Sequence, residues 1–465
     1  MAGSQGAAER LAEFAVELRY GGLPPGAQAA VKTHLLDTLG VALAAREVAS
    51  SRSLTQVASR WGGRPDATVW TDGRRLPSPA AALVNGTLCH TLEFDDTHLE
   101  SITHPSACVV PAALAVAEEE AADGERLLAS IVAGYEVTAR IGLAAAGAFH
   151  RHGFHATPLC GAFGATAAAG SLIGLDIGQM IDAFGIVASQ AAGIQAFLDD
   201  GAWTKRIHAG WAAHSGIVAA QLARAGCAGP RHVFENRYGF LASHAGPDGC
   251  DERRIVDGLG QRWETTAIAV KPYPCCHFNQ SCIDAALWLR EEHQIRPEDI
   301  DEIEASVPAR MLPVVCEPSR LKAFPTTPFG ALFSLPFCVA FALVRGALGV
   351  GDVNERTIHD TQIRKVAARV RCAALETSSF PDAYPGRVRA RLVDGRTMER
   401  EERINRGHPQ RPLSREDVLA KFKSVAARGL PLEQIDAIAL AVDRSENSTA
   451  AALMNTIAGA CAEVS

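Results

Sequence analysis

The sequence predicts two domains, a large all-helical one and a smaller one that mixes helices and strands. The chain has 465 residues, which is more than one compact core usually contains. Helical periodicity runs almost unbroken from residue 7 to about 240 and returns after residue 410. We therefore expect residues 1–262 to form the helical domain and 263–402 the α+β domain. Residues 403–465 are expected to return to the first domain.

The helical half is rich in small residues. Apolar side chains recur at three and four positions in VKTHLLDTLGVALAA (31–45), in 106–122 and in 124–146. Alanine and glycine dominate 161–176 and 208–226. Because small residues let helix axes approach closely, we expect a densely packed bundle.

The α+β segment is predicted from alternating or β-branched stretches. These stretches are 265–274, 300–309, 363–374 and 386–401. Asp394-Gly395 stands between two such runs in the last of them, which is a strong signal for a hairpin. Helices are expected between the strands, at 278–293 and from 329 to about 346.

Helical periodicity in the C-terminal segment begins with a capping signal. Ser414 is followed by Glu416 and Asp417, as expected for an N-cap with an acidic first turn. A second helical pattern follows in STAAALMNTIAGACAEV (448–464).

The overall composition is that of an ordinary globular enzyme. Hydrophobic residues make up 48% of the chain and charged residues 21%, with a formal net charge of −7. No lysine or arginine block suggests a nucleic-acid surface, so no nucleic-acid partner is expected. Glu9, Glu13 and Glu17 make the N-terminus an amphipathic helix and not a signal peptide. The apolar run 331–344 is shorter than the roughly 20 residues that span a bilayer. We expect a cytoplasmic protein without a membrane partner.

The twelve cysteines are scattered without a CxxC pair. In a cytosolic protein, most such cysteines are small buried hydrophobic residues. No ligand pairs recur at zinc-site spacing, so no metal site is expected.

The stretch HTLEFDDTHLESITHP (90–105) concentrates three histidines and four carboxylates in an otherwise apolar chain. Pro105 and Ser106 suit the first turn of a helix, which would place His104 at the positive end of the helix dipole. That position favours an anionic ligand and disfavours a protonated imidazole. A solvated loop with helix caps would also explain the stretch when it is taken alone.

Three further segments carry histidine or lysine in apolar surroundings. His155 follows a turn in AFHRHGFHATPLCG (148–161), and Lys205 and His208 share a helix face among small residues. Lys271 leaves a strand in VKPYPCCHFNQSCIDAA (270–286). A hydrogen-bonded core histidine is the alternative for His155, and a surface lysine is the alternative for Lys271. Lys205 among small residues is costly to bury unless a carboxylate of the protein or of a ligand meets it. Four such segments converging on one cleft would instead suit a substrate with several carboxylates.

Motifs along nearly the whole chain resemble the MmgE/PrpD family. They are LLDTLGVALA (35–44), EFDDTH with HPSA (93–107), GFHATPLCGAFGA (153–165), KRIHAGWAAHSGIVAAQLARAGCAGP (205–230), KPYPCC with IDAA (271–286), LFSLPFCVA (332–340) and GHPQRPLSREDVLAKF (407–422). That family contains 2-methylcitrate dehydratase, cis-aconitate decarboxylase and iminodisuccinate epimerase. The resemblance implies the MmgE/PrpD fold, with a large helical domain completed by the C-terminal segment and a smaller α+β lid. It also implies a homodimer, a pocket between the domains and chemistry without a cofactor or an obligatory metal.

The resemblance places the pocket at positions that match the family's motifs. These positions are Asp95, Asp96, Thr97, His104, His155, Lys205, His208 and Lys271. The chain departs from the pattern at Glu93, where relatives often have aspartate, and at Cys276, where the decarboxylase branch has histidine. His277 stands next to Cys276. Gln280 replaces a histidine of many bacterial relatives, and Phe337 replaces a frequent tyrosine. These departures argue against a straightforward cis-aconitate decarboxylase.

We predict a lyase of the 2-methylcitrate dehydratase kind, acting on a small di- or tricarboxylate through a carboxylate-stabilised carbanion. His104 and His155 are the expected proton-transfer pair, and Lys205 and Asp95 complete the expected catalytic set. The expected substrate-binding residues are Glu93, Asp96, Thr97, His208, Lys271, Cys276 and His277. The alternatives are an iminodisuccinate-like epimerase, a cis-aconitate-type decarboxylase and a non-catalytic polycarboxylate-binding protein.

Overall fold

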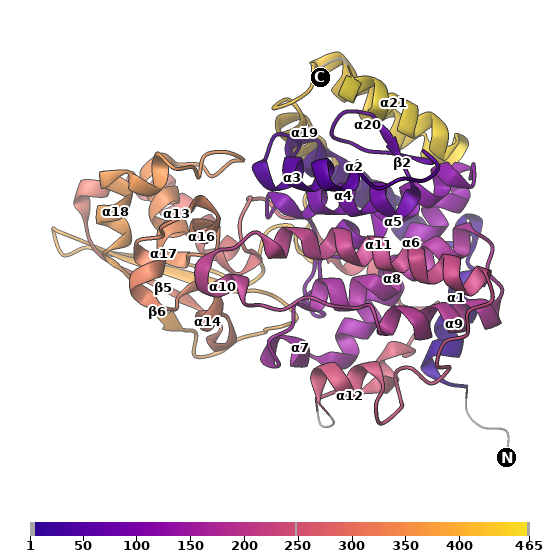
Figure 1. Cartoon of the computed structure of the whole chain (residues 1–465). Helices are drawn as coiled ribbons and strands as arrows, with labels where there is room; N and C mark the ends of the chain where they lie inside the picture. Colours follow the sequence, from indigo (N-terminus) through magenta and orange to yellow (C-terminus); the bar gives the residue numbers. More distant parts are fainter. Residues whose placement is uncertain (1–4, 247–248, 463–465) are drawn as a thin grey trace.

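The computed structural model describes residues 5–246 and 249–462, which fold into a helix-rich domain and a second domain built on a small mixed sheet. The helical domain contains α1 (Ala7–Glu17), α2 (Pro25–Ala44), α3 (Ala49–Ala58), α4 (Ser78–Thr91), α5 (Pro105–Glu119), α6 (Gly124–Ala145), α7 (Ala148–Arg151), α8 (Ala156–Leu172), α9 (Ile177–Ala188), α10 (Phe197–Asp200), α11 (Thr204–Arg224) and α12 (Phe240–Ala245). Figure 1 shows the second domain, in orange, projecting from one side of this bundle.

Close helix packing in the bundle depends on glycine, as the sequence predicts. A Cβ at Gly86 of α4 would lie 2.7 Å from the Cα of Gly210 of α11. A Cβ at Gly164 of α8 would lie 2.5 Å from the carbonyl oxygen of Gly134 of α6. These contacts hold four helices around one core because no side chain separates their backbones.

Helix α6 is long and apolar enough to cross a membrane by length and composition, with a mean hydropathy of 1.4 in its best window. The whole of that window is buried inside the protein. Its apolar character therefore matches its place as a central core helix.

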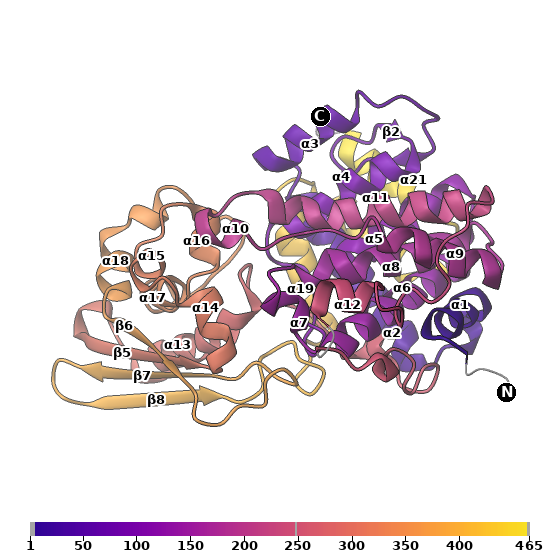
Figure 2. The same cartoon turned by 60° about the horizontal axis from the view of Figure 1, so that its bottom comes forward.

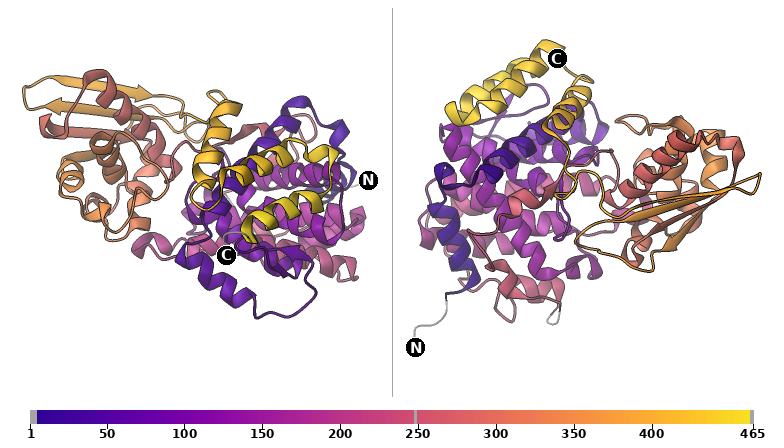
Figure 3. Two further views of the ribbon diagram at one scale, coloured as in Figure 1. Left: turned by 90° about the horizontal axis from the view of Figure 1, so that it is seen from above. Right: turned by 180° about the vertical axis from the view of Figure 1, so that it is seen from behind.

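The C-terminal helices α19 (Arg415–Ala426), α20 (Leu432–Asp443) and α21 (Ala450–Ala462) lie on the helical domain (Figure 3). Phe422 packs directly on Gly40 of α2, where a Cβ would meet its ring at 2.7 Å. Met454 and Ile457 join the same hydrophobic core. The predicted cap is confirmed, because Ser414 Oγ accepts from the Asp417 amide at 3.0 Å.

The second domain is built on a four-stranded sheet in the order β6-β5-β7-β8. Its strands are β5 (Ile300–Val307), β6 (Val370–Ala374), β7 (Gly386–Leu392) and β8 (Thr397–Glu402); β5 and β6 are parallel and the other pairs antiparallel. The hairpin predicted at Asp394-Gly395 is confirmed, with φ 89° at the glycine. Helices α13 (Gln280–His293) and α17 (Leu335–Arg345) pack against this sheet (Figure 2).

Two strand predictions are wrong in part. Of 265–274, only β4 (Ile268–Ala269) is a strand, because prolines follow at 272 and 274. Of 363–374, the first half belongs to α18 (Thr361–Ala367), whose N-terminus is capped by Asp360. The helix predicted from 329 is divided into α16 (Pro328–Leu332) and α17, with Ser334 capping the second.

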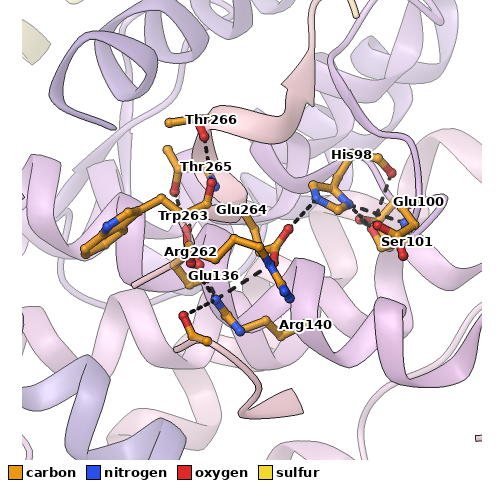
Figure 4. A network of polar contacts seen from close by, with 12 residues as sticks. His98, Glu100, Ser101, Glu136, Arg140, Arg262, Trp263, Glu264, Thr265 and Thr266 are labelled. Carbon is orange, nitrogen blue, oxygen red and sulfur yellow. Dashed lines mark hydrogen bonds and ion pairs between the residues drawn. The ribbon is translucent and has the colours of Figure 1, made fainter. Parts of the chain in front are cut away.

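A buried polar network fixes the chain where it leaves the helical domain (Figure 4). Arg140 of α6 lies 3.2 Å from the Glu136 carboxylate and donates to the carbonyl oxygens of Asp257 (2.6 Å) and Arg262 (2.7 Å). Glu136 also accepts from the Thr265 amide at 2.9 Å. Both Glu136 and Arg140 are fully buried.

The same network reaches the loop that follows α4. Glu264 lies 3.1 Å from His98 Nε2, and His98 belongs to β3 (Thr97–His98). Strand β3 pairs antiparallel with β4, so that Thr97 stands opposite Ala269, two residues before Lys271. The network therefore fixes the register that brings Thr97 and Lys271 together.

Candidate active site

A cavity of about 80 Å³ lies between the two domains, beside the loop 92–104. Eight of the eleven predicted site residues line it: Glu93, Thr97, His104, His155, Lys205, Lys271, Cys276 and His277. Phe197, Leu198 and Phe333 also border a neighbouring cavity of about 240 Å³. The remaining three predicted residues, Asp95, Asp96 and His208, stand behind the lining. The structure thus gathers most of the predicted residues in one place.

Glu93 connects the two lysines. Its carboxylate lies 2.5 Å from Lys205 Nζ, and its backbone carbonyl accepts from Lys271 Nζ at 3.0 Å. The residue is buried and adopts a φ of 54°, a region that non-glycine residues rarely occupy. This backbone turn directs the carbonyl to one lysine and the side chain to the other, and such strain is common at functional sites.

Asp95 is the buried anion behind the cavity. Its carboxylate lies 2.6 Å from His90 Nδ1, 3.5 Å from Lys271 Nζ and 3.7 Å from His104 Nδ1. Burial would raise the pKa of Asp95, but His90, His104 and Lys271 hold that pKa well below its usual value. Burial would lower the pKa of Lys271, yet the carboxylates of Asp95 and Glu93 raise it. The site therefore holds a fixed carboxylate beside a fixed ammonium group.

His104 is the N-cap residue of α5, as the sequence predicts. Its Nδ1 lies 2.6 Å from the carbonyl oxygen of Asp96 and donates to it, which leaves the lone pair of a neutral ring on Nε2. Burial and the nearby Lys271 hold the pKa of His104 well below the usual value for histidine. The ring is therefore neutral at pH 7, with its basic nitrogen free of bonds to any described residue.

Asp96 supports this arrangement from outside the cavity. Its carboxylate accepts from the Ser106 amide at 3.3 Å and lies 3.3 Å from His34 Nδ1. The side chain thus caps α5, and its backbone carbonyl orients the His104 ring. The structure gives the Asp96 carboxylate no place in the cavity, in contrast with its predicted contact with substrate.

His155 is the N-cap residue of α8, and its ring contacts that of His208. Their Nδ1 atoms are 3.2 Å apart, and the His155 ring stacks on His90 with a centroid distance of 5.5 Å. Burial, followed by the charge of Lys205, holds the pKa of His155 well below its usual value. Burial lowers the pKa of His208 to about 4. Both rings are neutral at pH 7, and His208 stands behind His155.

Thr97 is oriented by a chain of hydrogen bonds that the sequence did not indicate. The Asn405 oxygen accepts from the Tyr384 amide at 3.2 Å, so its amide nitrogen donates to His277 Nε2 at 2.9 Å. His277 Nδ1 then donates to Thr97 Oγ1 at 3.0 Å. The Thr97 hydroxyl hydrogen is left for another acceptor at the cavity.

Sequence reasoning missed His90, His150, Tyr384 and Asn405. His90 opens the histidine-rich stretch, five residues before Asp95, and that spacing was an available signal. His150 lines the cavity, and burial lowers its pKa to about 4. Tyr384 and Asn405 lie in loops of the second domain and have no local motif.

The Nδ1 atoms of five site histidines lie within hydrogen-bond distance of a carboxylate, a backbone carbonyl, a hydroxyl or another ring nitrogen: His90, His104, His155, His208 and His277. Among residues 5–246 and 249–462, no group of three or more histidine, cysteine, aspartate or glutamate side chains is arranged to hold a metal ion. The arrangement suits proton transfer and binding of anions by lysine.

Stability should depend on the buried neutral histidines. The pKa values of His155 and His277 are depressed by burial, so below about pH 6.5 the unfolded chain binds protons that the native chain does not. The free energy of unfolding is therefore expected to decrease as pH falls from 6.5 toward 4, by about 1.4 kcal/mol per pH unit for each such group. Urea unfolding at pH 7.5, 6 and 5 measures this; equal stability at all three values would contradict neutral burial.

Comparison with known proteins identifies the family of both domains. Residues 9–253 match the MmgE/PrpD N-terminal domain, and residues 273–447 match the MmgE/PrpD C-terminal domain. The cis-aconitate decarboxylase-like protein oryM of Aspergillus oryzae is 25% identical over 455 residues, which cover 94% of each chain. The cis-aconitate decarboxylases of Mus musculus and Homo sapiens are each 28% identical, over 90% and 92% of this chain and 86% and 89% of their own. Both domain models match in order, and the chain belongs to the MmgE/PrpD family.

Proposed function

We propose that the protein is a lyase that removes water from a small hydroxy di- or tricarboxylate, as 2-methylcitrate dehydratase does. The observation that carries the proposal is the state of His104. Its Nδ1 is held by the Asp96 carbonyl, and its Nε2 is a neutral base at the cavity. A reaction that starts with proton abstraction needs a base in this state, whereas protonation of a carbanion needs an acid.

Cationic groups at the cavity would stabilise the carbanion. Removal of a proton beside a carboxylate spreads negative charge over that carbon and the carboxylate oxygens. Lys205 and Lys271 are buried ammonium groups at the cavity, and the N-termini of α5 and α8 begin at His104 and His155. Fixed cations and helix N-termini lower the energy of such an intermediate.

The elimination can be written with its protons balanced. The C–H bond breaks, its proton moves to His104 Nε2, and the imidazolium formed lies 3.7 Å from the Asp95 carboxylate. The C–O bond then breaks as the double bond forms, and the hydroxide takes a proton to leave as water. The imidazolium of His104 returns its proton to the hydroxide, and the neutral ring of His155 lies beside it, with the two ring centroids 6.4 Å apart.

Decarboxylation is the second candidate function, because the similar proteins carry that name. It would use the same cations and would need His104 or His155 as an acid toward the carbanion. Cys276 and His277 line the cavity where the decarboxylase branch is expected to have its histidine. Epimerisation would use His104 and His155 on opposite faces of one carbon.

A product assay separates these reactions. Purified protein is incubated with 2-methylcitrate, cis-aconitate and iminodisuccinate, and alkene absorbance, released CO₂ and optical rotation are followed. The proposal predicts alkene formation from the hydroxy acid without CO₂. If the only reaction is CO₂ release from cis-aconitate, the protein is a decarboxylase and the dehydratase proposal is wrong. If the only change is in optical rotation, the protein is an epimerase.

Replacing Lys271 with methionine is expected to raise KM by about 10- to 100-fold. The lysine would supply a charge-assisted hydrogen bond to a substrate carboxylate, which contributes about 1.5–3 kcal/mol. Steady-state kinetics measure the effect. Lys32→Met, which removes a lysine paired with Glu446 outside the cavity, is the matched control and should leave KM unchanged. An unchanged KM for Lys271→Met would contradict the binding role.

We also propose that the second domain acts as a lid over this cavity and that the protein is a cytoplasmic homodimer. Exposed apolar side chains support the dimer: Ile194, Trp203 and Trp211 are 59%, 48% and 43% exposed on or beside α11. Light scattering on the purified protein tests it, and a monomer at micromolar concentration would contradict it.

A further inference from the structure

A second cavity between the domains contains a cluster of arginines that the proposed reaction does not use. Its volume is about 340 Å³, and it borders Thr91 and Leu92, directly before Glu93 in the chain. Three of its lining residues are Arg46, Arg206 and Arg428, all from the helical domain and its C-terminal segment. This volume is within the usual range for small-ligand pockets.

These arginines lack acidic partners. No described carboxylate lies within ion-pair distance of any of the three, whereas most other described arginines of the chain form such pairs. Glu47 is the carboxylate in the lining, and it points to Arg52 at 3.2 Å with its side chain 85% exposed. The cavity therefore carries a surplus of positive charge.

Burial makes this surplus costly. Arg46 is 5% exposed, and its Nε has no hydrogen-bond partner among the described residues; Arg206 is half-buried, and its covered Nε also lacks a described partner. A buried guanidinium group without an anion has lost its hydration without compensation. The buried Arg46, with the half-buried Arg206 at the same cavity, points to an anion from outside the chain that completes the site.

The three guanidinium groups are held in place by neutral contacts. Arg46 donates to the Gly429 carbonyl at 2.5 Å, and Arg428 donates to the Val350 carbonyl at 2.8 Å. Arg206 lies over the Phe329 ring at 4.7 Å and donates to Ser50 Oγ at 3.1 Å. Because these contacts fix the side chains without cancelling their charge, little conformational entropy remains to be lost on binding.

We propose that this cavity is a second anion site, which binds a small oxyanion with two or more charges, either phosphorylated or polycarboxylic. Phe329, Leu332 and the loop Gly349–Gly351 line its other side from the second domain. A bound anion therefore contacts both domains and stabilises their arrangement around the catalytic cavity. This proposal does not depend on which reaction the catalytic cavity performs.

Calorimetric titration with pyrophosphate and with tricarballylate tests the proposal. The Lys271→Met protein is used, so that binding in the catalytic cavity is weakened. At least one probe should bind with a stoichiometry of one per chain. Arg428→Gln and Arg206→Gln in that background should each raise the Kd by about tenfold or more, as loss of a charge-assisted hydrogen bond predicts. Arg224→Gln, on the same helix as Arg206 but paired with Glu120, is the control and should bind as its parent does.

Each result is decisive. Pyrophosphate binding alone identifies a phosphorylated ligand, and tricarballylate binding alone a polycarboxylic one; both agree with the site. No binding of either probe at millimolar concentration overturns the proposal, as does an unchanged Kd in both arginine variants. If Lys271→Met does not fold, the wild-type protein should bind two equivalents of a probe, and Arg428→Gln should raise the Kd of one of the two by about tenfold or more.

Discussion

A His104→Asn protein should fold normally and lose about 10²–10⁴-fold in kcat, as expected when a general base is removed. Asparagine can still donate to the Asp96 carbonyl, so the contact that positions the side chain is retained while the basic nitrogen is lost. Turnover with the best substrate and the melting temperature are measured on the same preparation.

The matched control for this substitution is His244→Asn. His244 also has its Nδ1 at a backbone carbonyl, that of Phe240 at 3.0 Å, but it lies in α12 outside the cavity lining. Its replacement should leave kcat unchanged. Wild-type turnover in a folded His104→Asn protein would remove His104 from the reaction.

Replacing Arg140 with methionine should lower the free energy of unfolding by about 3–5 kcal/mol. The substitution leaves Glu136 buried without its guanidinium partner and takes the donor from the carbonyls of Asp257 and Arg262. Removal of one partner of a buried ion pair is costly because the other charge stays in a medium of low dielectric constant. Urea unfolding of the two proteins measures the difference.

An exposed arginine gives the control for Arg140→Met. Arg253 is 87% exposed in its pair with Asp251, and Arg253→Met should change stability by less than about 1 kcal/mol. The Arg140 network sets the register of β3 on β4, which brings Thr97 and Lys271 together. The fraction of Arg140→Met protein that folds should therefore also show a raised KM. If Arg140→Met lost no more stability than Arg253→Met, the network would not be what fixes the chain where it leaves the helical domain.

Much of the site could be predicted from sequence because its residues lie in dense local motifs. His104 was placed at a helix start by Pro105, and the helix dipole argument holds in the structure. Lys205 was expected to need a carboxylate, and Glu93 supplies it at 2.5 Å. Helical periodicity and the Asp394-Gly395 turn were equally local signals, and both are confirmed.

What sequence reasoning missed depends on distant contacts. Strand β4 pairs with β3, a two-residue strand of the helical domain about 170 positions earlier in the chain, and hydrophobic periodicity does not reveal such a distant pairing. Asn405 reaches His277 from 128 positions away, and its role follows only from the folded backbone. Asp96 was expected to touch substrate, but the same carboxyl type serves equally well as a helix cap.

Proton NMR in deuterated water, on a panel of hydroxy and unsaturated polycarboxylates, tests directly whether this crevice exchanges a proton beside a carboxylate. The wild-type protein should convert at least one hydroxy acid to an alkene or exchange its α-proton for solvent deuterium. His104→Asn should catalyse the same reaction at least 10²-fold more slowly. Tight binding of these acids without any turnover or deuterium uptake would contradict the assignment of proton chemistry to the site.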